Sequence, residues 1–126
     1  MVPQELRQRT KDYAIRIIRL YRALPKSGDA QVIGKQLLRS GTSVASNYRA
    51  VCRARSKAEF IAKTGVVLEE ADETAFWLEI MDDTGMVQHG RLTAIRREAD
   101  ELLAIFAASI KTAKLHNKPP NGPMTR

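Results

Sequence analysis

Apolar side chains recur at alternating steps of four and three residues in four separate segments of the chain. That spacing is typical of helices that pack lengthwise against one another, and no segment shows the period-two alternation of a strand. We therefore predict an all-α fold, an antiparallel up-down-up-down four-helix bundle over residues 1–116. The expected helices cover about 4–24, Asp29 to about Ala54, Ser56 to Asp82 or Asp83, and a last segment that starts between Met86 and Arg91.

Local sequence signals set the boundaries of these helices. Pro25 ends the first helix, and Ser56-Lys57-Ala58-Glu59 is a capping box that opens the third. Gly85 lies just beyond the third helix, and Gly90 weakens the start of the fourth. Residues 117–126 read NKPPNGPMTR, with three prolines and no periodicity, so we predict a disordered C-terminal tail.

The second helix has an unusually thin packing edge. Two of its six seam positions are polar, and small residues surround them, so close helix packing is the simplest explanation. The polar residues could instead line a functional pocket, although no nucleophile–base pair lies nearby in the sequence. The predicted seam of this helix is Ile33, Leu37, Ser40, Val44, Asn47 and Val51. We assign Ser40 and Asn47 of the seam, with the neighbouring Ser43, to a structural polar core. The seam of the third helix is predicted to be Ile61, Thr64, Leu68, Ala71, Ala75 and Leu78, broadened on one side by Phe60, Val67 and Met81.

Charge is divided unevenly along the chain, whose net charge is +7. Residues 1–64 contain 14 Lys and Arg against 4 Asp and Glu, whereas residues 65–126 contain 7 against 10. This division favours a surface for a polyanion, or charge matching between neighbouring subunits, or both.

Basic residues of the second helix fall on the side opposite its seam, within about 40° of one line at roughly 100° per residue. No acidic residue interrupts this helix after Asp29. Contacts to phosphate need only such cations at helical spacing, whereas no aromatic platform or recognition helix supports base readout. A solvated outer face is the simpler alternative. The expected nucleic-acid-binding residues are Lys35, Arg39, Arg49, Arg53, Arg55, Lys57 and Lys63.

Trp77 lies almost opposite the seam predicted for the third helix. A Trp that points away from its own bundle usually covers an interface, although it could also be half-buried at a corner of the bundle. We expect a homo-oligomer contact in which apolar residues, ringed by carboxylates, face the arginines of a neighbouring copy. Its predicted residues are Val66, Glu69, Glu70, Glu73, Phe76, Trp77 and Ile80.

Two pairs of carboxylates leave room for enzymatic chemistry. Glu70 and Glu73, and Glu98 and Glu101, are spaced i, i+3 on successive helices, and helical nucleotide hydrolases hold Mg²⁺ with such pairs. In the helical count these four side chains point outward rather than into a shared cleft, so hydrolysis is the weakest hypothesis. We expect no catalytic residue, no cofactor and no metal site; the isolated His89, His116 and Cys52 fit surface or packing positions.

The chain has no apolar run near the ~20 residues of a membrane span, and its first ten residues lack the apolar region of a signal peptide. A single cysteine cannot form an intrachain disulfide. We expect a cytoplasmic protein that does not enter a membrane.

The stretch LLRSGTSVASNYRAVCRARSKAEF resembles the signature of the four-helix bundle proteins encoded in intervening sequences of bacterial 23S ribosomal RNA. That signature has Leu-x-Arg-Ser, then Ser, then Asn-x-x-Glu, a basic stretch, a capping Ser and an acidic residue before Phe. KTGVVLEEADETAFWLEIM is similar to the family's third helix, and the resemblance extends from about Leu6 to Leu115. Asn47 departs from the pattern, because Ala50 stands where the family often has Glu.

The resemblance implies an all-α bundle that assembles as a ring-like homopentamer. It also implies kinship with the accessory protein of diversity-generating retroelements, a basic pentamer that binds nucleic acid and a reverse transcriptase. The family has no known catalytic residues to carry over. Our leading hypothesis is an oligomeric, non-enzymatic bundle that binds RNA or DNA backbone, and the alternative is a scaffold for a protein partner without a nucleic-acid role.

Overall fold

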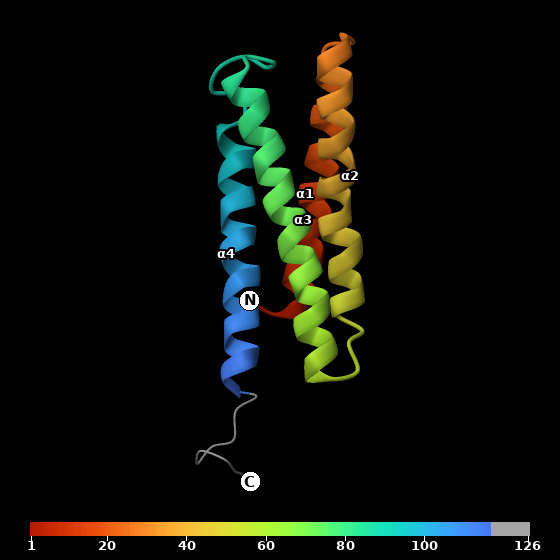
Figure 1. Ribbon diagram of the computed structural model, residues 1–126, viewed down its shortest axis with the longest axis vertical. Helices are drawn as coiled ribbons and strands as arrows, with labels where there is room; N and C mark the ends of the chain where they lie inside the picture. The colour runs from red at the N-terminus through yellow and green to blue at the C-terminus, as the bar shows by residue number, and fades with distance from the viewer. Residues whose placement is uncertain (117–126) are drawn as a thin grey trace.

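The computed structural model describes residues 1–116 as four α-helices, with no strand among these residues. The helices are α1 (Pro3–Ala23), α2 (Gly28–Val51), α3 (Lys57–Asp83) and α4 (Thr93–His116). Figure 1 shows that each helix runs antiparallel to the one before it, which confirms the all-α four-helix bundle. The tail predicted over residues 117–126 lies outside the described residues.

The predicted capping box at the start of α3 forms in part: Ser56 caps the helix, while the Glu59 side chain reaches the residue before the N-cap. The backbone N–H of Glu59 donates to Ser56 Oγ at 3.0 Å, and the Glu59 carboxylate accepts from the backbone N–H of Arg55 at 2.7 Å. These bonds satisfy donors that a helix N-terminus otherwise leaves without partners. The first turn of α3 is therefore anchored by its own sequence.

The start of α4 differs from the prediction. The helix begins at Thr93, later than the predicted range of 86–91, because the connection after α3 contains two glycines with positive φ. Gly85 has φ of +70° and Gly90 has φ of +85°, a backbone region that residues with a side chain rarely adopt and that no α-helix contains. The start of α2 is also earlier than expected, at Gly28 rather than after Asp29.

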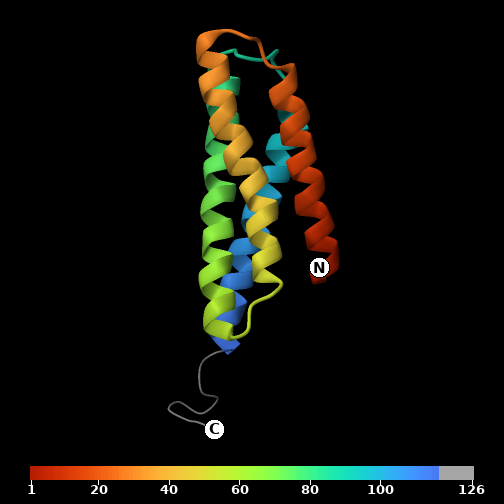
Figure 2. The same cartoon turned by 90° about the vertical axis from the view of Figure 1, so that its right-hand side faces the viewer.

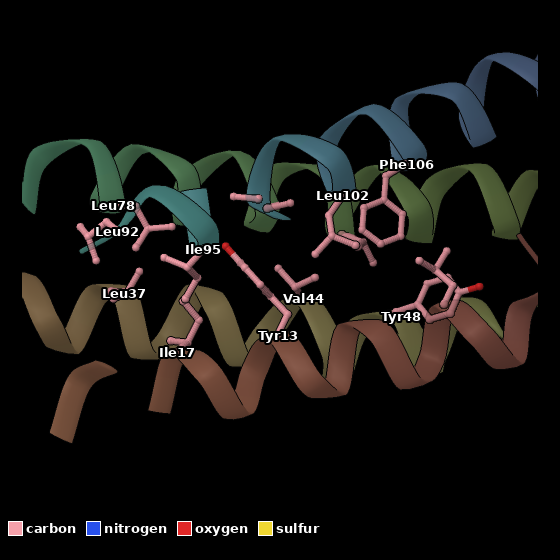
Figure 3. Packing of buried hydrophobic residues seen from close by; sticks show 14 of the residues in the cluster. Tyr13, Ile17, Leu37, Val44, Tyr48, Leu78, Leu92, Ile95, Leu102 and Phe106 are labelled. Atoms are coloured by element: carbon pink, nitrogen blue, oxygen red, sulfur yellow. The ribbon is translucent and has the colours of Figure 1, made fainter. Parts of the chain in front are cut away.

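Consecutive helices pack along their lengths, whereas α1 and α4 meet over a much smaller area. Figures 1 and 2 both show α4 continuing past the level at which α1 begins. Buried side chains from all four helices form one core, seen in Figure 3, in which the Tyr48 and Phe106 ring centroids are 5.7 Å apart. α2 and α3 therefore lie between two neighbours each, and α1 and α4 close the bundle only partly.

The core side of α3 is rotated relative to the predicted seam. Val67, Thr74 and Met81 are fully buried, whereas Leu68 and Ala75, two of the predicted seam residues, are only half-buried. The sequence is misleading here because α3 carries apolar side chains nearly all the way round. The contacts with α2 on one side and α4 on the other select which of them enter the core.

Tyr13 of α1 points toward α4 in the interior of the bundle (Figure 3). Its side chain is 1% exposed, and its hydroxyl has no hydrogen-bond partner among residues 1–116. Burial raises the pKa of Tyr13 far above its ordinary value, so the hydroxyl stays protonated at neutral pH.

Two glycines of α2 bring α1 close. A Cβ at Gly41 would lie 2.8 Å from Cγ1 of Ile17, and a Cβ at Gly34 would lie 2.6 Å from Cδ1 of Leu24. These separations are too short for carbon–carbon contacts, whose optimum is about 3.5–4.0 Å. Any larger residue would push α1 away from α2.

No helix among the described residues combines the length and the apolar character that crossing a bilayer requires.

We predict that Gly41→Ala destabilises the protein by about 1–3 kcal/mol, because the new methyl group overlaps the fully buried Ile17. Gly65→Ala in α3 is the control. A Cβ there meets nothing within 4 Å, so the higher helix propensity of Ala stabilises the protein by up to about 1 kcal/mol. Urea unfolding measures both free energies. Equal stability of the two variants would show that α1 does not depend on the glycine contact.

Candidate nucleic-acid interface

Most of the predicted nucleic-acid-binding side chains lie on the surface. Lys35, Arg39 and Arg49 are exposed on α2, and Arg53 and Arg55 are exposed in the connection that follows it. Lys57 is exposed at the start of α3, and Lys63 is half-buried one turn further on. The helical count therefore placed the stripe on the correct side of α2, and the ion pairs decide which of its charges are available.

Arg39 is neutralised within the chain. Its guanidinium donates to Oε1 of Glu70 at 3.2 Å and, through its other terminal nitrogen, to Oε2 of Glu73. The indole N–H of Trp77 donates to the same Glu73 oxygen at 3.1 Å. Arg39 and Trp77 together hold the pKa of Glu73 below its ordinary value. The arginine thus ties α2 to α3, and its charge is balanced by two carboxylates.

Glu59 balances two further cations at the start of α3. Nη2 of Arg55 lies 3.6 Å from Oε2 of Glu59, and Nζ of Lys63 lies 4.0 Å from Oε1. The backbone hydrogen bond from Arg55, with these cations, keeps the pKa of Glu59 below its usual range. Such exposed pairs contribute little stability, but they lower the net positive charge of this end of the stripe.

Four of the seven predicted cations make no ion pair within residues 1–116, namely Lys35, Arg49, Arg53 and Lys57. Three of them lie on or directly after α2, whose only acidic residue is Asp29 in its first turn. Of the seven predicted cations, those left available to a partner therefore lie along α2, in the turn that follows it and at the start of α3.

The four paired glutamates share no cleft, as predicted, and Glu101 is exposed, whereas Glu70, Glu73 and Glu98 are partly covered. Glu98 and Glu101 of α4 receive Arg9 of α1, whose guanidinium lies 2.7 Å from the first carboxylate and 2.5 Å from the second. Glu70 and Glu73 receive Arg39 in the same way. Each i, i+3 pair thus binds one arginine of a neighbouring helix. The pair on α4 faces α1 and the pair on α3 faces α2, so the two pairs do not meet in one cleft. No group of three potential metal ligands occurs among the described residues.

A groove of about 580 Å³ runs between α1 and α2 on the outer surface. Arg7 and Lys11 line it from α1, and Arg49 lines it from α2. The predicted nucleic-acid-binding residues include Arg49 but neither cation of α1. A signal was present, because positions 7 and 11 are one helical turn apart on one face, but sequence alone does not show which neighbour that face meets.

The predicted oligomer contact forms an exposed apolar patch on α3. Val66 is 42% exposed and Phe76 is 49% exposed, and the Phe76 ring meets Trp77 edge-on with centroids 4.9 Å apart. Trp77 and Ile80 are half-buried, and Trp77 also packs against the core. Glu69 is exposed, whereas Glu70 and Glu73 are engaged by Arg39.

The predicted polar core is only partly interior. Ser40 is fully buried and donates to the backbone carbonyl of Gln36 at 3.0 Å. Asn47 is half-buried and donates to the carbonyl of Ser43 at 2.9 Å, while Ser43 is itself half-buried. These hydrogen bonds stay within α2, which fits small polar residues that permit close packing rather than a reactive pocket.

Comparisons with known proteins place this geometry in a family. The family described as 23S rRNA-intervening sequence protein matches residues 4–108. A crystal structure from Bacteroides thetaiotaomicron, described as a protein of unknown function from the S23 ribosomal protein family, is 33% identical in sequence. That match has a TM-score of 0.81 and covers 88% of this chain and 99% of the other. No curated protein matches the chain.

These matches confirm the resemblance to the intervening-sequence proteins that the sequence motifs indicated. The kinship with the accessory protein of retroelements stays a prediction.

We predict that Glu73→Gln reduces the loss of stability on acidification. The pKa of Glu73 is depressed in the folded state, so this residue stabilises the protein above the ordinary carboxyl pKa of roughly 4.3. That contribution disappears as the pH falls through and below this value. Because the pair is partly exposed, the effect is less than about 1 kcal/mol. Urea unfolding between about pH 6 and about pH 3 measures it.

The control is Asp72→Asn, which removes an exposed carboxylate of α3 that makes no ion pair in the described part of the chain. It should keep the wild-type pH dependence. If both variants follow the wild-type curve, the link between Arg39 and Glu73 contributes nothing to stability in solution.

Proposed function

The chain belongs to the 23S rRNA-intervening sequence protein family, and from that premise we propose that it binds the phosphate backbone of RNA or DNA without acting as an enzyme. It does so as an oligomer of four-helix bundles. The binding surface is centred on the cations of α2 and of the turn that follows, and the protein serves as an accessory or structural factor for nucleic acid.

The observation that supports this proposal most directly is the set of cations left over after internal pairing. Lys35, Arg49, Arg53 and Lys57 have no carboxylate partner among residues 1–116. Cations in a row without nearby acids repel one another. This repulsion costs the folded state little free energy only where solvent screens the charges, at the surface. Neutralising phosphates on such a row releases counterions, and this release is the main source of sequence-independent affinity for nucleic acid.

The same surface favours backbone contacts over base recognition. Bases are read by stacking on exposed aromatic rings or by side chains that enter a groove of the duplex. Tyr13 and Tyr48 are buried in the core, and Phe76 and Trp77 belong to the acidic face of α3. We therefore propose binding that depends on charge and not on sequence.

Oligomerisation accounts for the apolar patch on α3. Val66, Phe76, Trp77 and Ile80 expose apolar surface beside carboxylates, a composition that suits the centre and rim of a protein–protein contact. A second copy supplies arginines for the exposed Glu69, and a ring of five copies is the assembly that the family resemblance implies. If the patch binds a different protein, such as a reverse transcriptase, the chain is a scaffold and the patch is its docking surface.

We predict that exchanging Arg49 and Arg53 for Glu weakens binding to mixed-sequence RNA equally for all sequences. Each lost phosphate contact on a single strand lowers the slope of log affinity against log salt by roughly 0.7. The control exchanges Arg97 and Lys111 of α4, which are outside the proposed surface, for Gln. Fluorescence anisotropy at several salt concentrations gives both slopes. Wild-type affinity that ignores salt would end the nucleic-acid proposal.

We predict that Trp77→Ala lowers the mass of the oligomer in multi-angle light scattering, because it removes the largest apolar side chain of the patch. Leu115→Ala, an exposed apolar change on α4, should leave the mass unchanged. Because Trp77 is half-buried, Phe76→Glu serves as a second variant that does not open the core. An unchanged mass for both patch variants would move the interface elsewhere.

A further inference from the structure

We infer that the groove between α1 and α2 is the track in which the phosphodiester backbone lies, and that Arg7 and Lys11 of α1 contact it together with Arg49 of α2. This inference rests on the proposed function and assigns its site. It adds a second helix to a surface that the sequence analysis had assigned to α2 and the start of α3.

The groove is hollow because its α2 wall is built from small side chains. Thr42, Ala45 and Ser46 line it, and their short side chains leave the space of about 580 Å³ between the two helices. Gly41 keeps α1 close to α2 underneath, since its missing Cβ makes room for Ile17. The result is an open polar channel between the two helices, floored by their close contact.

The charges of the groove all have one sign. Arg7, Lys11 and Arg49 are exposed, and none of them makes an ion pair within residues 1–116. The other lining residues are uncharged, and no carboxylate lines the groove in the described part of the chain. Cations on both sides of a groove, Arg7 and Lys11 from α1 and Arg49 from α2, concentrate positive potential more strongly than a flat stripe does.

The row of cations on this side of α2 extends beyond the residues that line the groove. Lys35 and Thr42 are seven residues apart, as are Thr42 and Arg49, so all three lie on one side of α2. At 1.5 Å per residue, Lys35 and Arg49 are separated by roughly 21 Å along the helix axis. In Figures 1 and 2, α1 and α2 run side by side over this length. The track is thus several nucleotides long rather than a site for one phosphate.

Uncharged polar groups complete the chemistry that a backbone needs. The amides of Gln4 and Gln8 line the α1 wall, and Gln8 Nε2 donates to Asp12 at 2.8 Å. Amide and hydroxyl groups commonly bond phosphate and sugar oxygens beside the cations. None of the groove's lining residues is aromatic, so the track offers no stacking surface for bases. An acidic peptide would satisfy the cations as well, but the continuous one-sign row suits a regular polyanion better.

The test removes the two α1 cations, which the proposed function alone does not use. We predict that Arg7→Gln with Lys11→Gln lowers affinity for mixed-sequence single-stranded RNA and DNA at least roughly tenfold at low salt. The salt slope should fall by roughly 1.4, which is two contacts at about 0.7 each. A duplex probe of the same sequence forms a third arm. The matched control, Arg16→Gln with Arg19→Gln, removes the same charge from exposed positions of the same helix outside the groove.

Each outcome separates the two proposals. A large loss in the groove variant with a small loss in the control supports the track, and the arm with the steeper loss identifies the strand that occupies it. Equal losses of affinity in the groove and control variants, or no loss in the groove variant, overturn the track. In either case, salt-dependent binding by the wild-type protein leaves the proposed function in place. Wild-type protein that binds none of the probes in a salt-dependent way overturns the proposed function itself. Circular dichroism melting verifies that both variants stay folded.

Discussion

The close approach of α1 to α2 determines much of what surrounds it. Gly34 and Gly41 leave no side chain on the side of α2 that meets α1, so Leu24 and Ile17 settle directly against the helix backbone. The same helix carries Ser40 inward and short polar residues outward. Because Thr42, Ala45 and Ser46 are short, the outer crease between α1 and α2 stays open, while Leu37 and Val44 of the same helix fill the core. The hollow that we assign to nucleic acid is therefore a consequence of how the core is packed.

Arginine pairing then divides the cations into two classes. Arg9 and Arg39 each bind two glutamates spaced one turn apart on the neighbouring helix, so these arginines serve the bundle. A guanidinium is suited to this because its planar fork can donate to two carboxylates at once. Arg49 has no such neighbour among the residues described. The contrast between Arg39 and Arg49, ten residues apart on one helix, shows why a count of charges overstates a binding surface.

Two faces of the molecule differ in charge and polarity. The α1–α2 side is positive and polar, whereas the outer side of α3 is apolar and acidic around Phe76 and Trp77. If copies assemble through the acidic face, as we propose, several basic grooves on one particle would bind a long polyanion more tightly than one groove can. Glu73 lies where these two functions meet, since it accepts from Arg39 of α2 and from Trp77 of the patch.

Periodicity alone determined the number of helices, their approximate limits and the all-α class, because the repeat of apolar positions is a local property of each helix. The N-cap at Ser56 is equally local and formed as expected. Tertiary structure decided the rest. It selected Val67 and Met81 over Leu68 for the core of α3, because that helix is apolar nearly all round and only its two neighbours define an inside. It also paired Arg39 and brought Arg7 and Lys11 beside Arg49, since contacts between residues far apart in the chain depend on which faces of the helices meet.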